Sequence, residues 1–233
     1  MSPQLFGTEH ILYIVISTLV CSATLLLSKK YAKTAMAQVC VLKAIAFALL
    51  IAIVANRLSQ VFRYGMVRWY CIIPDNFCGM TSLVLALAVL FGKRDNNVLH
   101  FVWLLGLFGG ISTVIYASFV GQGPTIFYLP TITGLVHHSL SATMVVALFL
   151  FQQIDVTYKK WYCTVFGFTS YLTVGAFLMH TFALPDAYHI AEPLLPGTPL
   201  TAWVMAPMYA VGYGLILLIA EIVKKHSKQR QMA

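Results

Sequence analysis

Seven long apolar stretches constrain the fold of this sequence more than any other feature. A helix that crosses a membrane needs about 20 mostly apolar residues. Segments of this length cover roughly residues 10–28, 35–56, 74–92, 98–119, 131–152, 161–180 and 201–223. The sequence therefore predicts an all-α polytopic membrane protein, a bundle of seven transmembrane helices that forms a single domain over residues 1–233.

The composition excludes several other classes of protein. Hydrophobic residues make up 60% of the chain and charged residues 9%, whereas soluble domains are about 45–50% apolar and about 25% charged. Such a chain cannot cover its surface with solvated groups, which excludes a soluble enzyme, a disordered chain and a disulfide-stapled secreted domain. The net charge is +8, but the basic residues do not gather on one solvated face. We therefore expect membrane lipid as the partner and no nucleic acid, and the sequence leaves an oligomeric partner open.

The basic residues predict an orientation. If the chain crosses the membrane seven times, three of its loops and its C-terminal tail lie on the same side of the membrane. These four segments contain Lys29, Lys30, Lys33, Lys93, Arg94, Lys159, Lys160, Lys224, Lys225, Lys228 and Arg230. Because cytoplasmic loops are enriched in Lys and Arg, we expect the N-terminus outside and the C-terminus in the cytoplasm. This makes the chain a multi-pass protein of the cell membrane.

Segment 57–73 is the exception, since Arg57, Arg63 and Arg68 fall on the predicted outer side. One interpretation is a long second helix whose polar end reaches the membrane interface. The other is that the arginines bind an anionic lipid headgroup, with Arg63 and Arg68 as the candidates.

The ionisable residues inside the spans are mainly histidines. No Asp or Glu lies in the middle of a span, which argues against a proton or cation transporter. The last span has no Lys before Lys224, so it offers no site for a retinal Schiff base. The predicted orientation places one cysteine and four histidines in the outer half of the membrane or just outside it: Cys78, His10, His138, His180 and His189.

This clustering predicts a Cys–His pair in an outward-facing pocket. Cys78 lies near the start of a predicted helix, where the helix dipole favours a thiolate. A histidine within hydrogen-bond reach would complete the pair for acyl transfer, and we expect His138 in that role. Because adjacent helical residues point about 100° apart, we expect either His137 or His138 to bond a neighbouring helix instead. The supporting pocket residues are expected to be His10, Asn76, His137 and His180.

Several short motifs occur in a fixed order along the chain. They are Phe6-Gly7-Thr8-Glu9-His10 before the first span, Pro74-x-x-x-Cys78, Gly106-x-x-Gly109-Gly110 in the fourth span, and His138-Ser139 in the fifth. Through them, residues 5 to about 150 resemble the YwaF-like integral membrane proteins of bacteria. That family is similar in turn to a eukaryotic transmembrane family containing a cysteine-dependent glycerophospholipid acyltransferase.

The resemblance implies roles for individual residues. Cys78 matches the cysteine nucleophile, His138 the histidine of the fifth span, and His10 the N-terminal histidine. It also implies a bacterial inner or plasma membrane location. The chain departs from the family pattern at Asn76, where bacterial members often have His, and at Gly79, where they often have an acidic residue.

The preferred function is accordingly a lipid acyltransferase or acyl hydrolase that uses no cofactor and no metal. One alternative is a histidine-ligated metal hydrolase, in which ligands would converge from His10, His138 and His180. Another is a non-catalytic lipid or small-solute binder or transporter. Haem ligation by paired histidines is a weaker alternative.

Overall fold

The computed structural model describes residues 5–62, 67–117, 123 and 125–232, with the backbone alone for 227–232. This part of the chain is all-helical. Its α-helices are α1 (Thr8–Tyr31), α2 (Ala35–Val61), α3 (Phe77–Phe91), α4 (Asn97–Ile115), α5 (Leu129–Leu150), α6 (Tyr162–Phe182) and α7 (Ala202–Met232). Two short 3-10 helices, η2 (Trp69–Ile72) and η4 (Tyr158–Lys160), precede α3 and α6. The prediction of an all-α polytopic membrane protein is confirmed at this level.

Six of the described helices are long and apolar enough to cross a membrane, and α3 is the exception. It has 15 residues and is therefore about 22 Å long, shorter than a hydrocarbon core of about 30 Å. The count of seven spans and the orientation of the termini stay predictions.

Several helix boundaries differ from the sequence prediction: α7, for example, continues to Met232, beyond the expected end near residue 223. Two of the differences lie near the candidate site. We expected the second apolar segment to end near residue 56, but α2 continues to Val61, so Arg57 lies within the helix, as the interpretation of a long second helix implies. We expected the third to begin at Pro74, but α3 begins at Phe77 because the Asn76 side chain caps it. A side-chain oxygen that accepts a backbone N–H at this position sets where a helix starts.

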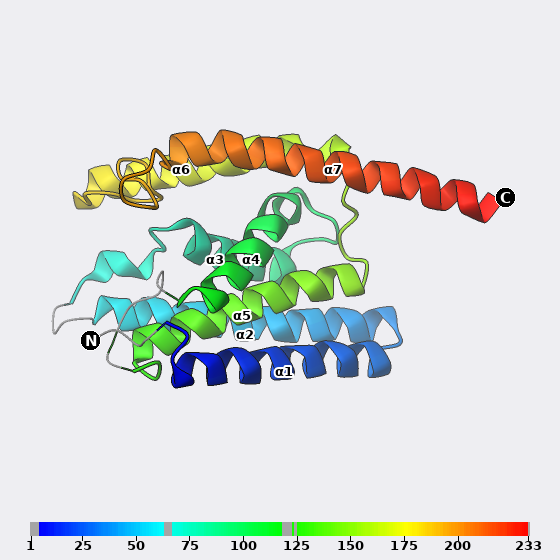
Figure 1. The fold of residues 1–233 in the computed structure, drawn as a ribbon, viewed down its shortest axis with the longest axis horizontal. Coiled ribbons are helices and arrows are strands. Elements are labelled where there is room, and N and C mark those ends of the chain that lie inside the picture. The colour runs from blue at the N-terminus through cyan, green and yellow to red at the C-terminus, as the bar shows by residue number, and fades with distance from the viewer. Residues whose placement is uncertain (1–4, 63–66, 118–122, 124, 233) are drawn as a thin grey trace. The chain divides into compact units, whose positions relative to one another are not determined.

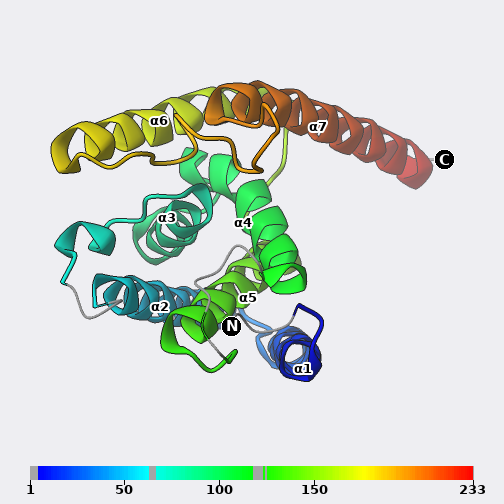
Figure 2. The same cartoon turned by 60° about the vertical axis from the view of Figure 1, so that its left-hand side comes forward.

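The chain divides into two compact units, an N-terminal unit (Met1–Gln153) and a C-terminal unit (Ile154–Ala233). In the N-terminal unit α2, α3, α4 and α5 pack around one another, and α1 contacts α5 (Figures 1 and 2). The buried apolar side chains at the centre of these four helices include Leu49, Ile53, Leu85, Val102, Leu135, Met144 and Leu148. This four-helix core positions the candidate site.

In the C-terminal unit, α6 and α7 lie side by side (Figures 1 and 2). The connection between them returns along α6, where Tyr188 is fully buried. A Cβ at Gly175 would lie 2.7 Å from the Tyr188 side chain, so the absence of a side chain there allows this close approach. The connection is thus a packed part of the unit.

Candidate functional site

Cys78 is the second residue of α3, at the end of the N-terminal unit where α2 finishes and α3 and α5 begin. We call this the cysteine end. Asn76 caps the helix here, because its side-chain oxygen accepts the N–H of Gly79 at 2.8 Å and its carbonyl accepts that of Met80 at 3.1 Å. The half-buried Cys78 therefore has a backbone fixed by its own helix cap.

The thiol of Cys78 faces α4. Its hydrogen-bond partner is the side chain of Thr113, and a Cβ at Gly109 would lie 3.2 Å from its Sγ atom. Gly109 and Thr113 are four residues apart and so share one face of α4. The sulfur thus occupies space that any other residue at position 109 would fill.

Two buried histidines of α5 lie deeper in the same core. The ring centroids of His137 and His138 are 4.2 Å apart, and their planes are tilted by 33°. Nδ1 of His137 is 3.3 Å from Oγ of Ser82 on α3, which confirms that one of the pair bonds a neighbouring helix. Among the described residues, the imidazole of His138 has no hydrogen-bond partner.

Ser82 relates the histidines to the cysteine. It follows Cys78 by four residues, so the two side chains share a face of α3 and lie about 6 Å apart along its axis. The absence of a side chain at Gly110 allows α4 to pack closely on α5, because a Cβ there would lie 2.7 Å from the carbonyl oxygen of His138. The described contacts thus connect α3 to the histidine pair through His137.

An ion pair between Arg57 and Asp75 completes the cysteine end. Arg57 donates from Nη1 to Oδ1 of Asp75 at 3.2 Å and from Nη2 to Oδ1 of Asn56 at 3.0 Å. Asn56 in turn donates to the carbonyl of Pro130 at 3.0 Å. These bonds join α2, the α3 cap and the start of α5. Arg57 also interacts electrostatically with both buried histidines.

His10 serves as a link between helices. The N–H of Phe6 donates to its Nδ1 at 3.1 Å, so Nε2 carries the proton and donates to the carbonyl of Val114 at 2.9 Å. Both ring nitrogens are therefore engaged with backbone, and they hold the start of α1 against the end of α4.

The other predicted site residues lie in different settings. The Asn76 amide is engaged at both ends, because its Nδ2 also donates to Asp75 at 3.2 Å. His180 is exposed near the end of α6, in the C-terminal unit. Arg68 is partly buried, and its N–H donates to the carbonyl of Val61 at 2.9 Å. Arg63 lies outside the described residues.

Four residues of this region were not identified from the sequence as members of the site: Ser82, Thr113, Arg57 and Asp75. Ser and Thr in apolar spans are too common to single out. Arg57 did give a signal, because it belongs to the three arginines that break the charge rule on the predicted outer side. The charge pattern does not predict that the Arg57 side chain is largely covered by the protein.

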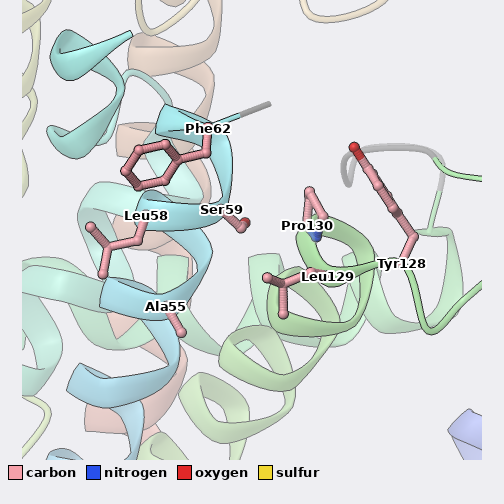
Figure 3. A pocket seen from close by; sticks show the side chains of 7 residues that line it. All are labelled: Ala55, Leu58, Ser59, Phe62, Tyr128, Leu129 and Pro130. Atoms are coloured by element: carbon pink, nitrogen blue, oxygen red, sulfur yellow. The ribbon is translucent and has the colours of Figure 1, made fainter. Parts of the chain in front are cut away.

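An apolar groove lies beside the cysteine end, between the last turns of α2 and the start of α5 (Figure 3). It has a volume of about 460 Å³ and is lined by Ala55, Leu58, Ser59, Phe62, Tyr128, Leu129 and Pro130. Residue 57 points about 160° away from residue 59 on a helix. The groove and Arg57 therefore lie on opposite faces of α2.

Within the described part of the chain, no three His, Cys, Asp or Glu side chains come together in a group that could hold a metal ion. The chemistry that these residues offer is that of a thiol, two imidazoles and a guanidinium in an apolar surrounding. Such buried ionisable groups in a membrane protein point to function.

Comparison with known proteins places the chain in a family. No curated protein and no solved structure matches it. The model of the TMEM164 family matches residues 5–223, a range that includes every described residue of the cysteine end. Because this match covers most of the chain, the protein is an integral membrane protein that belongs to the TMEM164 family.

Proposed function

We propose that the protein is a cysteine-dependent acyltransferase or acyl hydrolase that acts on membrane lipid. The observation that carries this proposal is the pair of contacts made by one face of α3. Cys78 bonds Thr113 on that face, and one turn further Ser82 bonds His137. A nucleophile and an imidazole pair in one water-poor core are the groups that covalent acyl transfer needs.

In the proposed first step, Sγ of Cys78 attacks the carbonyl carbon of a lipid ester, and its proton passes to the imidazole of His138. The tetrahedral intermediate then collapses, the alkoxide of the lysolipid leaves, and the imidazolium returns the proton to it. A thioester remains on Cys78. A hydroxyl acceptor or water then attacks the thioester carbonyl, and His138 accepts its proton. The C–S bond breaks, the acyl group leaves on the acceptor as an ester or acid, and the imidazolium returns the proton to the thiolate of Cys78.

The local structure supports this assignment of roles. His137 is held by Ser82, whereas the imidazole of His138 has no competing partner among the described residues. The thiol bonds Thr113 and not His138 among the described residues, so we propose that it turns toward His138 when the substrate binds, since catalytic hydrogen bonds often tighten only in the substrate complex. Since the Asn76 side chain is engaged as a cap and the N–H groups of Gly79 and Met80 bond Asn76, we assign the oxyanion to the backbone N–H of Cys78 at the helix start.

The experiment is trapping of the thioester. The purified protein is incubated in nanodiscs with a phospholipid that carries a fluorescent acyl chain. Label bound to the protein and released by neutral hydroxylamine marks an acyl-thioester. We expect label on wild type and none on Cys78→Ala, together with loss of acyl exchange in the lipid profile of cells.

Cys21→Ala is the matched control, because Cys21 is also a partly buried cysteine of an apolar helix in the same unit. It should keep the label. Label that persists in Cys78→Ala would refute the nucleophile, and lipid-induced stabilisation without any label would favour a non-catalytic lipid binder.

We further propose that the chain crosses a bacterial plasma membrane seven times, with the N-terminus outside. The support is the distribution of Lys and Arg and the resemblance to the YwaF-like proteins. Fusion of alkaline phosphatase to the C-terminus should give an inactive reporter and fusion of green fluorescent protein a fluorescent one. The reverse result would overturn the orientation.

A further inference from the structure

Arg57 is a charged and largely covered side chain within a candidate membrane span. Only 11% of its side chain is exposed, and α2 is one of the six helices suited to cross the membrane. A buried guanidinium is expensive and is kept where it pairs with another group or binds a ligand. Its partners therefore decide what it does.

The pairing of Arg57 is incomplete. Its contact with Asp75 uses a single carboxylate oxygen, and that oxygen also accepts from Asn76. Nε of Arg57 is buried with no partner among the described residues. A guanidinium has five N–H donors and binds best to two oxygens at once. Arg57 thus keeps the capacity to bind a second oxyanion.

The charges around this pair leave a positive excess. Asp75, Arg57 and Arg68 all interact electrostatically with Cys71 of η2, so one carboxylate and two guanidinium groups lie around one thiol. The Asp75 side chain is 43% exposed, far more than that of Arg57. The carboxylate therefore occupies the accessible side of the pair, where an incoming anion would displace it.

Aromatic side chains mark the same end as a membrane interface. Phe62 and Trp69 are exposed and contact each other edge to face, with ring centroids 6.0 Å apart. Trp is enriched at headgroup level, which applies to Trp69. The anion within reach at that level is the phosphate of a phospholipid, which matches a guanidinium in shape and charge.

We propose that Arg57 and Arg68 form a phosphate-binding site for a phospholipid and that Asp75 occupies Arg57 until the phosphate displaces it. This proposal depends on the proposed function in one respect, namely that the bound lipid is the substrate. Arg57 is then a positioning residue, which holds the lipid by its phosphate near the α3 start.

The test measures binding in the Cys78→Ala protein, so that failure of the chemistry does not affect it. Three probes are compared by thermal stabilisation in detergent: 1-palmitoyl-lysophosphatidylcholine, 1-palmitoylglycerol and inorganic phosphate. The two lipids share one chain and differ in the phosphate-bearing headgroup. We expect the lysophospholipid to bind at least about tenfold more tightly, as for a hydrogen bond to a charged group.

Variants separate this site from a structural ion pair. Arg57→Gln should bind both lipids alike, and Arg57→Lys should keep part of the preference. Asp75→Asn should tighten binding of the lysophospholipid, because it removes the competing carboxylate. Arg94→Gln is the control: Arg94 follows the far end of α3 and bonds the carbonyl of Gln152 at 2.7 Å, so its loss should leave the preference unchanged.

Three outcomes would overturn the proposal. They are equal binding of the two lipids by the parent protein, a headgroup preference that survives Arg57→Gln, and weaker lysophospholipid binding by Asp75→Asn. The last would mark the ion pair as purely structural. If inorganic phosphate alone stabilised the protein as much as the lysophospholipid, the site would bind free phosphate and not a lipid.

Discussion

The two ends of the N-terminal unit both contain a buried histidine and an acidic residue, but they arrange them differently. At the opposite end, where α3 finishes and α4 begins, Nε2 of His100 lies 2.7 Å from Oδ1 of Asp95. The N–H of Asp95 also donates to the carbonyl of Gln153 at 3.0 Å. At the cysteine end, Asp75 pairs with Arg57, and the imidazole of His138 is left without a partner among the described residues.

The difference lies in what each imidazole contacts. A carboxylate fixes the imidazole of His100 within five residues of sequence, so this pair ties a loop to its own helix. His138 lies beside a second imidazole and in a core that also contains a thiol. Burial is common to both ends, and the choice of partner distinguishes them.

The largest expected effect contrasts one histidine from each end. His138→Gln should lower the rate of acyl transfer by about 10²–10⁴-fold, the usual contribution of a general base. His100→Gln should change the rate little, because His100 bonds Asp95 at the opposite end. Single-turnover release of the labelled acyl chain measures both. Equal losses would mean that the two ends do not differ in chemistry.

A second prediction concerns the stability of the opposite end. Asp95→Ala should lower the free energy of unfolding by about 1–3 kcal/mol, since it removes a hydrogen-bond partner from a buried imidazole. Asp95 has a φ of 54°, and Asn tolerates that left-handed conformation. Asp95→Asn should therefore cost less. Thermal unfolding in detergent gives the comparison, and thioester labelling of Cys78 should stay intact in both variants.

A third prediction tests the space around the thiol. Gly109→Ala places a Cβ 3.2 Å from Sγ of Cys78 and should slow alkylation of Cys78 by maleimide several-fold. Gly106→Ala is the matched control on the same helix, because its Cβ would meet Ser141 and Leu85 instead. Similar slowing by both variants would indicate a general disturbance of α4 packing and not a contact with the sulfur.

The smallest expected effect is electrostatic. Burial raises the pKa of the Cys71 thiol, Asp75 raises it further, and Arg57 and Arg68 lower it. A negative charge disfavours the thiolate, so Asp75→Asn should lower the pKa and speed alkylation near pH 8 by about twofold. Arg68→Gln should act in the opposite sense. The measurement uses a protein in which Cys71 is the sole cysteine, and slower alkylation of Asp75→Asn would contradict the charge arrangement.

The sequence predicted the helices better than their contacts. The apolar segments were sufficient to predict the helices. Gly106 and Gly110 of α4 lie against α5 side chains or backbone, a contact that the helix prediction alone does not contain. The roles of Thr113 and Ser82 depend on how each helix is rotated. A span that is apolar all round carries little information about its rotation, since lipid and protein neighbours accept the same side chains.

The ends of the helices were a further source of error. The second apolar segment was expected to stop near residue 56, but the helix includes Arg57, in agreement with the interpretation of a long second helix. The guanidinium is compatible with the helix because Asp75 and Asn56 accept its hydrogen bonds. Such pairing between distant segments overrides the local preference for a charged residue in a loop.

The sparse packing of α1 has a consequence for the choice of membrane. The helix has 24 residues, of which His10 alone is buried, and it is about 36 Å long. The N-terminal unit itself therefore leaves most of this surface open to lipid chains, over a length that exceeds the hydrocarbon thickness of about 30 Å. The tilt and attachment of this helix should respond to bilayer thickness before any other part of the N-terminal unit does.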